Sequence, residues 1–423
     1  MRVPARYRRG FLGVLAVREY RMLWISQALS ETGDQLARVA LAVLVYARTA
    51  SAALTALTYA LTYLPALLGG PLLSGLADRH PRREVMVWCD LGRAVLVAAM
   101  AVPGMPLAPL CVLLFVVQLL EAPARAARMA VTVDLLPADR YVTGVAFGHM
   151  TSQVTNLAGF GAGGVAIALT GPHIALVVDT GTFLASALIV GAGLRRRPAP
   201  PPDGAGPRPW SGGAAGLILG DPRLRSLLGL ALLAGFYLAP EALAVPYAAG
   251  LGAGPAAAGL LMTAIPAGSV IGILVFCRLA GPEARLRHSG PLAVLASVPL
   301  LGFLLRPGLV LSFVLLGLVG ALMAYQVAIN AEFVRIVPEG MRGRAVGLAG
   351  SILIAAQGAG MIFGGALAEL LTPATAIATL GAAGIAFGLP LAAAFRRERF
   401  SPSWPERNSI RPRGPVDRGR SPS

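Results

Sequence analysis

Long apolar runs, separated by short segments rich in Arg, Pro and Gly, make up most of the chain. A helix that crosses a bilayer needs about 20 mainly apolar residues, and twelve runs meet that requirement. We therefore predict an all-α membrane protein with twelve transmembrane helices. The predicted spans are residues 22 to 46, 53 to 77, 85 to 102, 106 to 123, 143 to 169, 173 to 194, 225 to 249, 256 to 280, 290 to 306, 309 to 333, 345 to 371 and 374 to 395.

The composition excludes an ordinary soluble domain. Hydrophobic residues make up 56% of the 423 positions and charged residues only 13%, with a mean hydropathy of +0.69. The net charge of +16 is typical of nucleic-acid binders, but the basic residues, all of them Arg, are spread over the segments between the apolar runs. We therefore expect a lipid bilayer as the environment and no nucleic-acid partner.

The arginines also predict the direction of the spans. The N-terminal segment, the connections after even-numbered spans and the tail hold 32 Arg, and the other side holds Arg48 and Arg306. Short cytoplasmic loops collect positive charge, so both termini are expected in the cytoplasm and the protein in the inner (plasma) membrane. The basic N-terminus precedes an apolar run that is long and carries charges, which indicates a first membrane helix rather than a cleaved signal peptide.

The connections divide the chain into five parts. Residues 1–21 form a basic cytoplasmic N-terminus, 22–194 a first six-helix bundle, 195–224 a Pro- and Gly-rich cytoplasmic linker, and 225–395 a second six-helix bundle. Residues 396–423 are rich in Arg, Pro and Ser and are expected to be disordered, with attraction to anionic lipid headgroups as a modest role.

The two predicted bundles resemble each other in sequence. Because six crossings are an even number, both copies run in the same direction, as in transporters built from parallel repeats with a site between them. A shift of 201 residues places Pro137 on Pro338, Gly163-Gly164 on Gly364-Gly365 and Pro172 on Pro373; a shift of 202 places Ala40-Leu41-Ala42-Val43 on Ala242-Leu243-Ala244-Val245 and Gly70 on Gly272.

A motif between spans two and three suggests a family. The segment Ser74-Gly-Leu-Ala-Asp78-Arg79-His-Pro-Arg82-Arg83 resembles the Gly-x-Leu-Ala-Asp-Arg-x-Gly-Arg-Arg signature of the major facilitator superfamily (MFS). The resemblance covers all twelve spans and is closest to the drug, macrolide and siderophore exporter branch. Gly33-Asp34, Asp90-Leu-Gly-Arg93, Pro123-Ala-Arg125 and Asp179-Thr-Gly-Thr-Phe183 look like that branch too.

The resemblance implies a latch that stabilises the outward-facing state. In the family, the loop aspartate and its basic neighbours pair with each other and with a helix dipole. That role falls here on Asp78, Arg79, Arg82 and Arg83, and we expect Asp90 and Arg93 to support it as an ion pair. Ser74 and Pro81 replace the two glycines of the signature, and Phe160 replaces the proline of the antiporter motif in span five; these departures leave open whether coupling is altered.

Charges inside the first span are the main candidates for chemistry. Glu31, Asp34 and Arg38 lie within an arc of about 60° on one helix face, and a charge at mid-membrane costs about 2.5 to 3.5 kcal/mol. Asp34 and Arg38 are four residues apart and are expected to pair, which leaves Glu31 the less compensated carboxylate. Burial raises the pKa of a carboxyl group and a nearby Arg lowers it, a balance that allows proton exchange near neutral pH. The alternative is that Asp34 and Arg38 only neutralise each other.

Other polar residues of the spans have two interpretations each. Glu241, in span seven, falls beside Arg38 under the 202-residue shift, which suggests that both face one shared cavity. The alternative is that Glu241 points outward at a kink caused by Pro240. Asp179 and Glu121 are expected to make polar contacts near helix boundaries. A lone histidine, His149, is more often a packing residue than a titrating group.

No feature of the sequence indicates an enzyme, a cofactor or a metal. Phosphate loops, HExxH and GxSxG are absent, and Cys89, Cys111 and Cys277 are scattered. We expect a secondary transporter whose two bundles rock about a central cavity, and which exports amphipathic small molecules by proton antiport as a monomer. An MFS importer or facilitator is the first alternative, and a non-transporting receptor or scaffold is the second.

Overall fold

The computed structural model describes residues 13–65, 76, 79–198 and 212–399, and across these ranges the secondary structure is helical, with no strand. The helices, in chain order, are α2 (Arg18–Thr49), α3 (Ala52–Ala60), α5 (Arg82–Met100), α6 (Leu107–Leu135), α7 (Ala138–Thr170), α8 (Pro172–Gly193), α9 (Gly212–Gly220), α10 (Pro222–Leu232), α11 (Ala234–Tyr237), α12 (Ala239–Gly250), α13 (Pro255–Leu279), α14 (Pro282–Leu295), α15 (Val298–Leu301), η1 (Gly302–Leu305), α16 (Leu309–Leu322), α17 (Tyr325–Ile336), η2 (Glu339–Met341), α18 (Arg342–Leu370) and α19 (Pro373–Arg399).

Eight of the described helices are long and apolar enough to cross a membrane. Consecutive short helices count as one span where they continue each other, as α10 to α12 do over Pro222–Gly250. The helix α6 runs to Leu135, although the sequence predicted an end at residue 123. Pro123 lies inside this helix without ending it, so Glu121 sits near the middle of the helix and not at its boundary.

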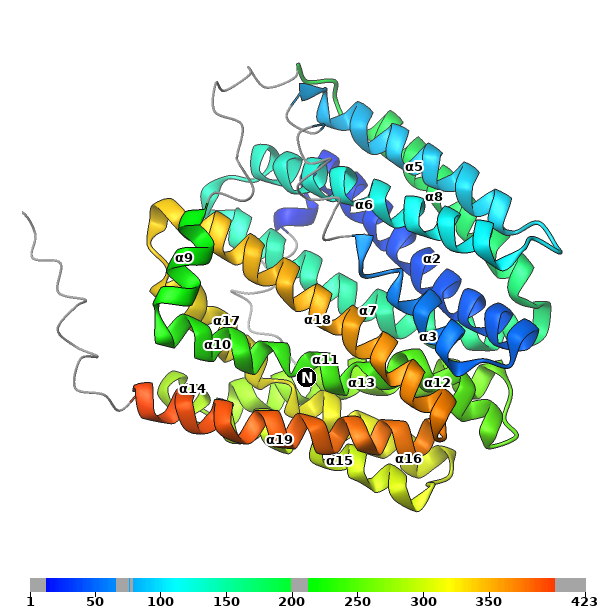
Figure 1. Cartoon of the computed structure of the whole chain (residues 1–423). Coiled ribbons are helices and arrows are strands. Elements are labelled where there is room, and N and C mark those ends of the chain that lie inside the picture. Colours follow the sequence, from blue (N-terminus) through cyan, green and yellow to red (C-terminus); the bar gives the residue numbers. More distant parts are fainter. Residues whose placement is uncertain (1–12, 66–75, 77–78, 199–211, 400–423) are drawn as a thin grey trace, which may run out of the picture.

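The helices form two groups that lie above one another in Figure 1. The first group, α2 to α8, is drawn in blue to blue-green, and the second, α10 to α19, in green to red. Within the first group α2 packs on α7 and α8, and α5 packs on α6 and α8. Two pairs of helices make the main contacts between the groups: α7 with α13, and α3 with α18.

The two ends of the helices differ in their connections. At one end, which we call the hairpin side, Arg48 binds the Met105 carbonyl, His173 contacts the Ala101 carbonyl, and the Tyr247 hydroxyl donates to Pro307. At the other end, the linker side, Arg195 and Arg197 pair with Glu19 and Arg196 pairs with Glu84. The hairpin side therefore carries the turns after α2, α5, α7 and α12, and the linker side carries the basic residues 195–197.

The turn between α2 and α3 is tight. Ala50 closes α2 in the left-handed region at φ 51°, and its N–H donates to the Tyr46 carbonyl. Ser51 then caps α3, because its Oγ accepts the backbone N–H of Leu54 at 3.1 Å. A serine cap satisfies one of the N–H groups that a helix start leaves without a partner. The first residues of α3 are thus held at the hairpin side.

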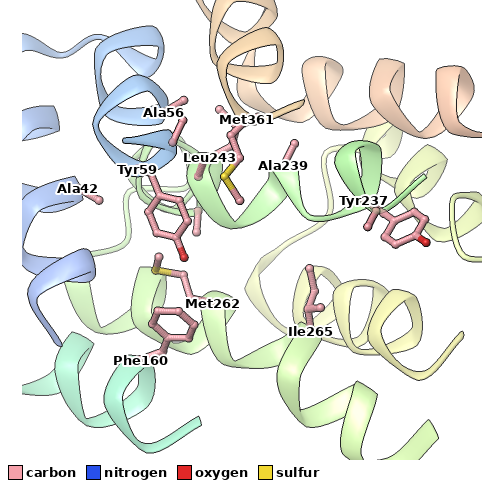
Figure 2. Packing of buried hydrophobic residues seen from close by; sticks show 14 of the residues in the cluster. Ala42, Ala56, Tyr59, Phe160, Tyr237, Ala239, Leu243, Met262, Ile265 and Met361 are labelled. Carbon is pink, nitrogen blue, oxygen red and sulfur yellow. The ribbon is translucent and has the colours of Figure 1, made fainter. Parts of the chain in front are cut away.

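One buried hydrophobic cluster joins the two groups (Figure 2). Tyr59 of α3 and Phe160 of α7 pack with Met262 of α13, and Leu243 of α12 packs near Met361 of α18. Large side chains fill this region, while glycines bring the backbones together elsewhere along the same helices. Such close approach drives helix association in lipid, where apolar burial alone gives no preference.

The glycine contacts between the groups gather toward the hairpin side. A Cβ on Gly164 of α7 would lie 2.8 Å from the Gly259 Cα of α13, and a Cβ on Gly365 of α18 would lie 2.4 Å from the Ala56 Cβ of α3. Gly164 and Gly365 are equivalent positions under the 201-residue shift. Pro172 and Pro373, also equivalent, both open their helices.

Candidate functional site

A cavity of about 660 Å³ lies between the groups and is lined mainly by α2, α6 and α7, with contributions from the turn that follows α3 and from α18. It reaches from Tyr20, near the linker-side start of α2, to Arg38, about two thirds of the way along that helix. The cavity is unusually polar for the interior of a membrane protein. Its polar lining comprises Gln27, Glu31, Asp34, Gln35, Arg38, Thr62, Tyr63, Glu121, Arg125, Arg128, Thr132, Ser152, Gln153, Asn156 and Gln357.

A second cavity of about 410 Å³ lies mainly within the other helix group. The two share Gln153, and the second is lined mostly by apolar residues of α10, α13, α17 and α18. Gln326 and Asn330 supply amides there, and it contains no charged side chain. The cavity at the first helix group is therefore charged and the one at the second is mainly apolar, and the two linings together suit an amphipathic molecule.

A buried ion pair at the wall of the cavity joins α2 to α5. Arg93 Nη2 lies 2.8 and 2.9 Å from the two carboxylate oxygens of Asp34, and the Arg93 side chain is only 2% exposed. The Arg93 guanidinium also lies 4.2 Å from the centroid of the Phe183 ring of α8. Asp34 therefore pairs with Arg93 and not, as the sequence predicted, with Arg38. Asp34 thus binds the arginine of a neighbouring helix instead of the arginine one turn away on its own helix.

Arg38 contacts an aromatic ring in place of an acid. Its guanidinium lies 5.3 Å from the centroid of Tyr63, a distance typical of a cation–π contact. Behind Tyr63 is Tyr59, whose ring centroid is 6.1 Å away and whose hydroxyl donates to Glu241 at 3.3 Å. Glu241 is buried and is not part of the cavity lining. The structure therefore links Arg38 and Glu241 through two tyrosines rather than placing both in one cavity.

Two more aspartates lie beside the Asp34–Arg93 pair. Asp90 accepts a hydrogen bond from Ser186 at 2.6 Å and makes no ion pair with Arg93, contrary to the sequence prediction. Asp179 is 1% exposed and accepts from Thr182 at 3.1 Å. Its Oδ1 lies only 2.3 Å from the place where a Cβ on Gly33 would stand. Asp179 is therefore packed inside the first helix group and makes no helix-boundary contact.

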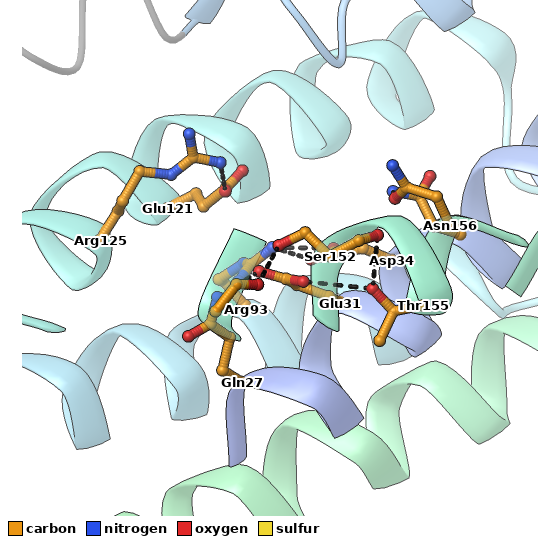
Figure 3. A network of polar contacts seen from close by, with 11 residues as sticks. Gln27, Glu31, Asp34, Arg93, Glu121, Arg125, Ser152, Thr155 and Asn156 are labelled. Atoms are coloured by element: carbon orange, nitrogen blue, oxygen red, sulfur yellow. Dashed lines mark hydrogen bonds and ion pairs between the residues drawn. The ribbon is translucent and has the colours of Figure 1, made fainter. Parts of the chain in front are cut away.

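Glu31 and Glu121 line the cavity from opposite helices (Figure 3). Glu31 accepts hydrogen bonds from Gln27 at 2.7 Å and from Thr155 at 3.2 Å, without a basic partner within ion-pair distance. Glu121 pairs with Arg125 at 2.5 Å, one turn further along α6. Glu121 was predicted at a helix boundary, and Arg128, which lines the same wall, was not among the predicted site residues. A helix that continues past Pro123 places Glu121 and Arg125 one turn apart, a spacing that predicts this pair.

The residues assigned to a latch hold other elements of the first group. Asp78 lies outside the described residues, and Arg79 is exposed. Arg82 pairs with Asp134 at the end of α6, and Arg83 donates to the Gly191 carbonyl of α8. The described part of the motif thus fixes α5 to its two neighbours on the linker side.

Within the described residues, no group of three His, Cys, Asp or Glu side chains is arranged to hold a metal ion. The His149 side chain lies outside the described side chains.

Comparison with known proteins identifies the fold. The profile described as Major Facilitator Superfamily matches residues 23–331. Among solved structures, a bacterial homologue of the human lysosomal transporter Spinster, in an inward-facing and occupied conformation, has a TM-score of 0.73 and 16% identity; the match covers 91% of this chain and 98% of that one. No curated protein sequence matches.

Two further transporters are similar in structure. The nucleoside transporter NupG has a TM-score of 0.70 at 13% identity, with 89% of this chain and 99% of that chain covered. The peptide transporter POT in complex with sulfate has a TM-score of 0.67 at 16% identity, with coverages of 90% and 94%. At these identities the likeness establishes a common fold.

Proposed function

The chain belongs to the Major Facilitator Superfamily, and on that premise we propose that it is a secondary transporter that exports amphipathic small molecules in exchange for protons. The observation that carries this proposal is the buried Asp34–Arg93 pair at the wall of a polar cavity between two helix groups. A buried ion pair with further carboxylates beside it is costly in a membrane, and intramembrane ionisable groups mark ion pathways.

We propose twelve spans, in two parallel six-helix halves. In this assignment α2, the α3 region, α5 and α7 are four further spans in addition to the eight apolar helices. Charges lower the hydropathy of α2 and α5, but Asp34 and Arg93 neutralise each other, so both helices can lie in hydrocarbon. The linker side, which carries most of the arginines, faces the cytoplasm in this arrangement.

Alternating access is supported by the placement of the contacts between the groups. The contacts of Gly164, Gly365 and Glu369 gather at the hairpin side, while the central cavity extends toward the linker side. In the proposed orientation this is an inward-facing state. Rocking of one half against the other would separate the glycine contacts and close the cavity at its cytoplasmic end.

Proton exchange is assigned to the acidic residues of the cavity. Glu31 has no basic partner and Asp34 has one, so each can exchange a proton when the cavity changes its hydration. Arg38 and Glu241 tune the proton affinity of these carboxylates, Glu241 through Tyr59 of α3 and Tyr63 of the turn that follows it. A proton that crosses 100 mV supplies about 2.3 kcal/mol, enough for about fiftyfold accumulation when one net charge moves per cycle.

Proteoliposomes that contain the pH dye pyranine test direction and coupling together. A panel of amphipathic cations, anions and neutral compounds is added outside. Entry of a compound in exchange for protons makes the lumen alkaline, entry together with protons acidifies it, and facilitated entry leaves the pH unchanged. An alkaline response that disappears in the double variant Asp34→Asn/Arg93→Gln supports the proposal; acidification supports an importer.

An importer or facilitator remains the first alternative, because the similar structures include a nucleoside transporter and a peptide transporter. A receptor or scaffold is the alternative of another class, and it predicts binding of a compound without its entry into the lumen. Two cavities that share Gln153 and lie one on each helix group favour transport over this alternative.

A further inference from the structure

A groove of about 790 Å³ runs along the second helix group, away from the central cavity. All its lining residues belong to α14, α15 and α19, and none is shared with the two central cavities. Many of them are exposed, including Leu295 at 47%, Val298 at 41% and Leu389 at 58%. The groove therefore opens outward, toward the lipid in a membrane-embedded chain.

Small residues make the floor of the groove. Gly290 of α14 lines the groove with Ala392 and Ala393 of α19, and a Cβ on Gly290 would lie 3.2 Å from the Ala392 Cβ. Here the helices touch closely, and the larger side chains stand on either side as walls. The result is a narrow apolar channel, which suits an extended hydrocarbon chain.

Basic residues lie at one end of this channel only. Arg287 and His288 on α14 and Arg396 on α19 line its linker-side end, and all three are exposed. Among the described residues, neither Arg287 nor Arg396 makes an ion pair. Nearby acids are Glu283, one turn before Arg287, and Glu398, which binds Ser226. The two guanidinium groups are thus available to an anion.

The length of the groove indicates its occupant. From Arg287 to Val298 the helix rises about 16 Å, which is about half of a hydrocarbon core about 30 Å thick. A neighbouring protein helix would need a surface that continues across the whole core. A groove one leaflet deep, apolar along its length and basic at the headgroup level, matches a single phospholipid with an anionic headgroup.

We propose that the α14–α19 groove is a binding site for one anionic phospholipid of the linker-side leaflet. Its phosphate binds Arg287 and Arg396, and one acyl chain lies over Gly290 and Ala392 between the walls formed by Leu295 and Leu389. The site shares no residue with the central cavity, so this inference stands whether or not the chain exchanges protons.

Native mass spectrometry of the delipidated protein tests the site. The protein is titrated with dioleoyl phosphatidylglycerol or with dioleoyl phosphatidylcholine, which has the same chains and no net charge. We expect the first phosphatidylglycerol to bind at least tenfold more tightly than the first phosphatidylcholine. Arg287→Gln/Arg396→Gln should remove most of this preference, while Arg195→Gln/Arg196→Gln, an equal loss of charge elsewhere on the linker side, should keep it.

A second variant tests the apolar part without touching the charges. Ala393→Trp fills the groove and should weaken the affinity for the first phosphatidylglycerol molecule fivefold or more. Equal affinity for the two lipids, or wild-type phosphatidylglycerol affinity in both the charge variant and Ala393→Trp, would overturn the proposal. Loss of a dimer in Ala393→Trp with unchanged lipid binding would overturn it too, in favour of a second copy of this chain.

Discussion

Glu369, at the end of α18, caps the start of α3 in the other helix group by binding Ser51. Its carboxylate accepts hydrogen bonds from the Ser51 Oγ at 3.0 Å and from the backbone N–H of Ala53 at 3.1 Å. Ser51 is itself the cap of α3, so the carboxylate completes the first turn of a helix that belongs to the opposite half. In the proposed alternating access, this contact belongs to the closed hairpin side and would break when that side opens.

Glu369→Gln should therefore weaken the closed hairpin side. A carboxylate at an exposed helix N-terminus contributes about 0.3 to 1 kcal/mol, so the ratio of closed to open molecules should fall about two- to fivefold. Distances between spin labels at positions 169 and 251, on the hairpin-side ends of α7 and α12, would report the change. Glu339→Gln, an exposed acid on the linker side, is the matched control; an equal shift in that variant would contradict a specific role for Glu369.

Gly164→Ala should open the same side by a different route. The added Cβ would meet Gly259 Cα at 2.8 Å and the Pro255 carbonyl at 2.9 Å, both backbone atoms that no side-chain rotation can move. Overpacking costs about 1 to 3 kcal/mol, which predicts at least a fivefold shift in the same distance distribution. Gly148→Ala is the control, because it lies on the same helix with open space around it. No shift in Gly164→Ala would mean that α7 and α13 do not meet as described.

Asp34→Asn should lower stability as well as transport. It leaves the Arg93 guanidinium buried without its carboxylate, a change that typically costs about 3 to 5 kcal/mol. The double variant Asp34→Asn/Arg93→Gln should recover much of the melting temperature in detergent but not the proton-coupled transport. Wild-type coupling in the double variant would show that the pair is structural.

Glu31→Gln separates coupling from folding more cleanly. Glu31 has no ion-pair partner, and its bonds from Gln27 and Thr155 can be kept in part by an amide oxygen. We expect nearly unchanged thermal unfolding and loss of the pyranine response in proteoliposomes. Retention of a wild-type pH-dependent response would remove Glu31 from the proposed pathway.

Asp78→Asn addresses the latch that the family resemblance implies. Expression and thermal stability should stay nearly intact, while the resting ensemble shifts toward the inward-facing state and turnover slows. The carboxylate of Asp134, which pairs with Arg82, provides a comparison. If Asp134→Asn shifts the label distances and Asp78→Asn does not, the pairing between α5 and α6 carries the effect instead.

The spacing of residues along the sequence predicted which side chains line the cavity better than it predicted which side chains pair with each other. Glu31, Asp34 and Arg38 lie on one face of α2 and do line one cavity, as the helical period requires. The same period suggested an Asp34–Arg38 pair, but Arg93 comes from a helix distant in sequence, and a single sequence carries no signal for that contact. Asp90 lost its predicted partner for the same reason.

Helix ends were the weaker part of the prediction. Pro123 and the charges after it suggested that the fourth span stops there, although Glu121 and Arg125 neutralise each other one turn apart and let α6 continue. The membrane-like character of the chain followed from composition, and the equivalence of Gly164 and Gly365 followed from the internal repeat. Their actual contacts, with α13 and α3, depend on how the halves dock.

The contact between Gly164 and Gly259 brings backbone against backbone, with no side chain to order when the hairpin side closes. An interface of long side chains loses about 0.5 to 1.5 kcal/mol of rotamer entropy per immobilised side chain, a term that grows with temperature. The contact between Gly164 and Gly259 loses no such side-chain entropy. The contribution of this contact to the balance between the open and closed forms should therefore change little between a cold and a warm environment, unlike that of the Glu369–Ser51 contact, which orders two side chains.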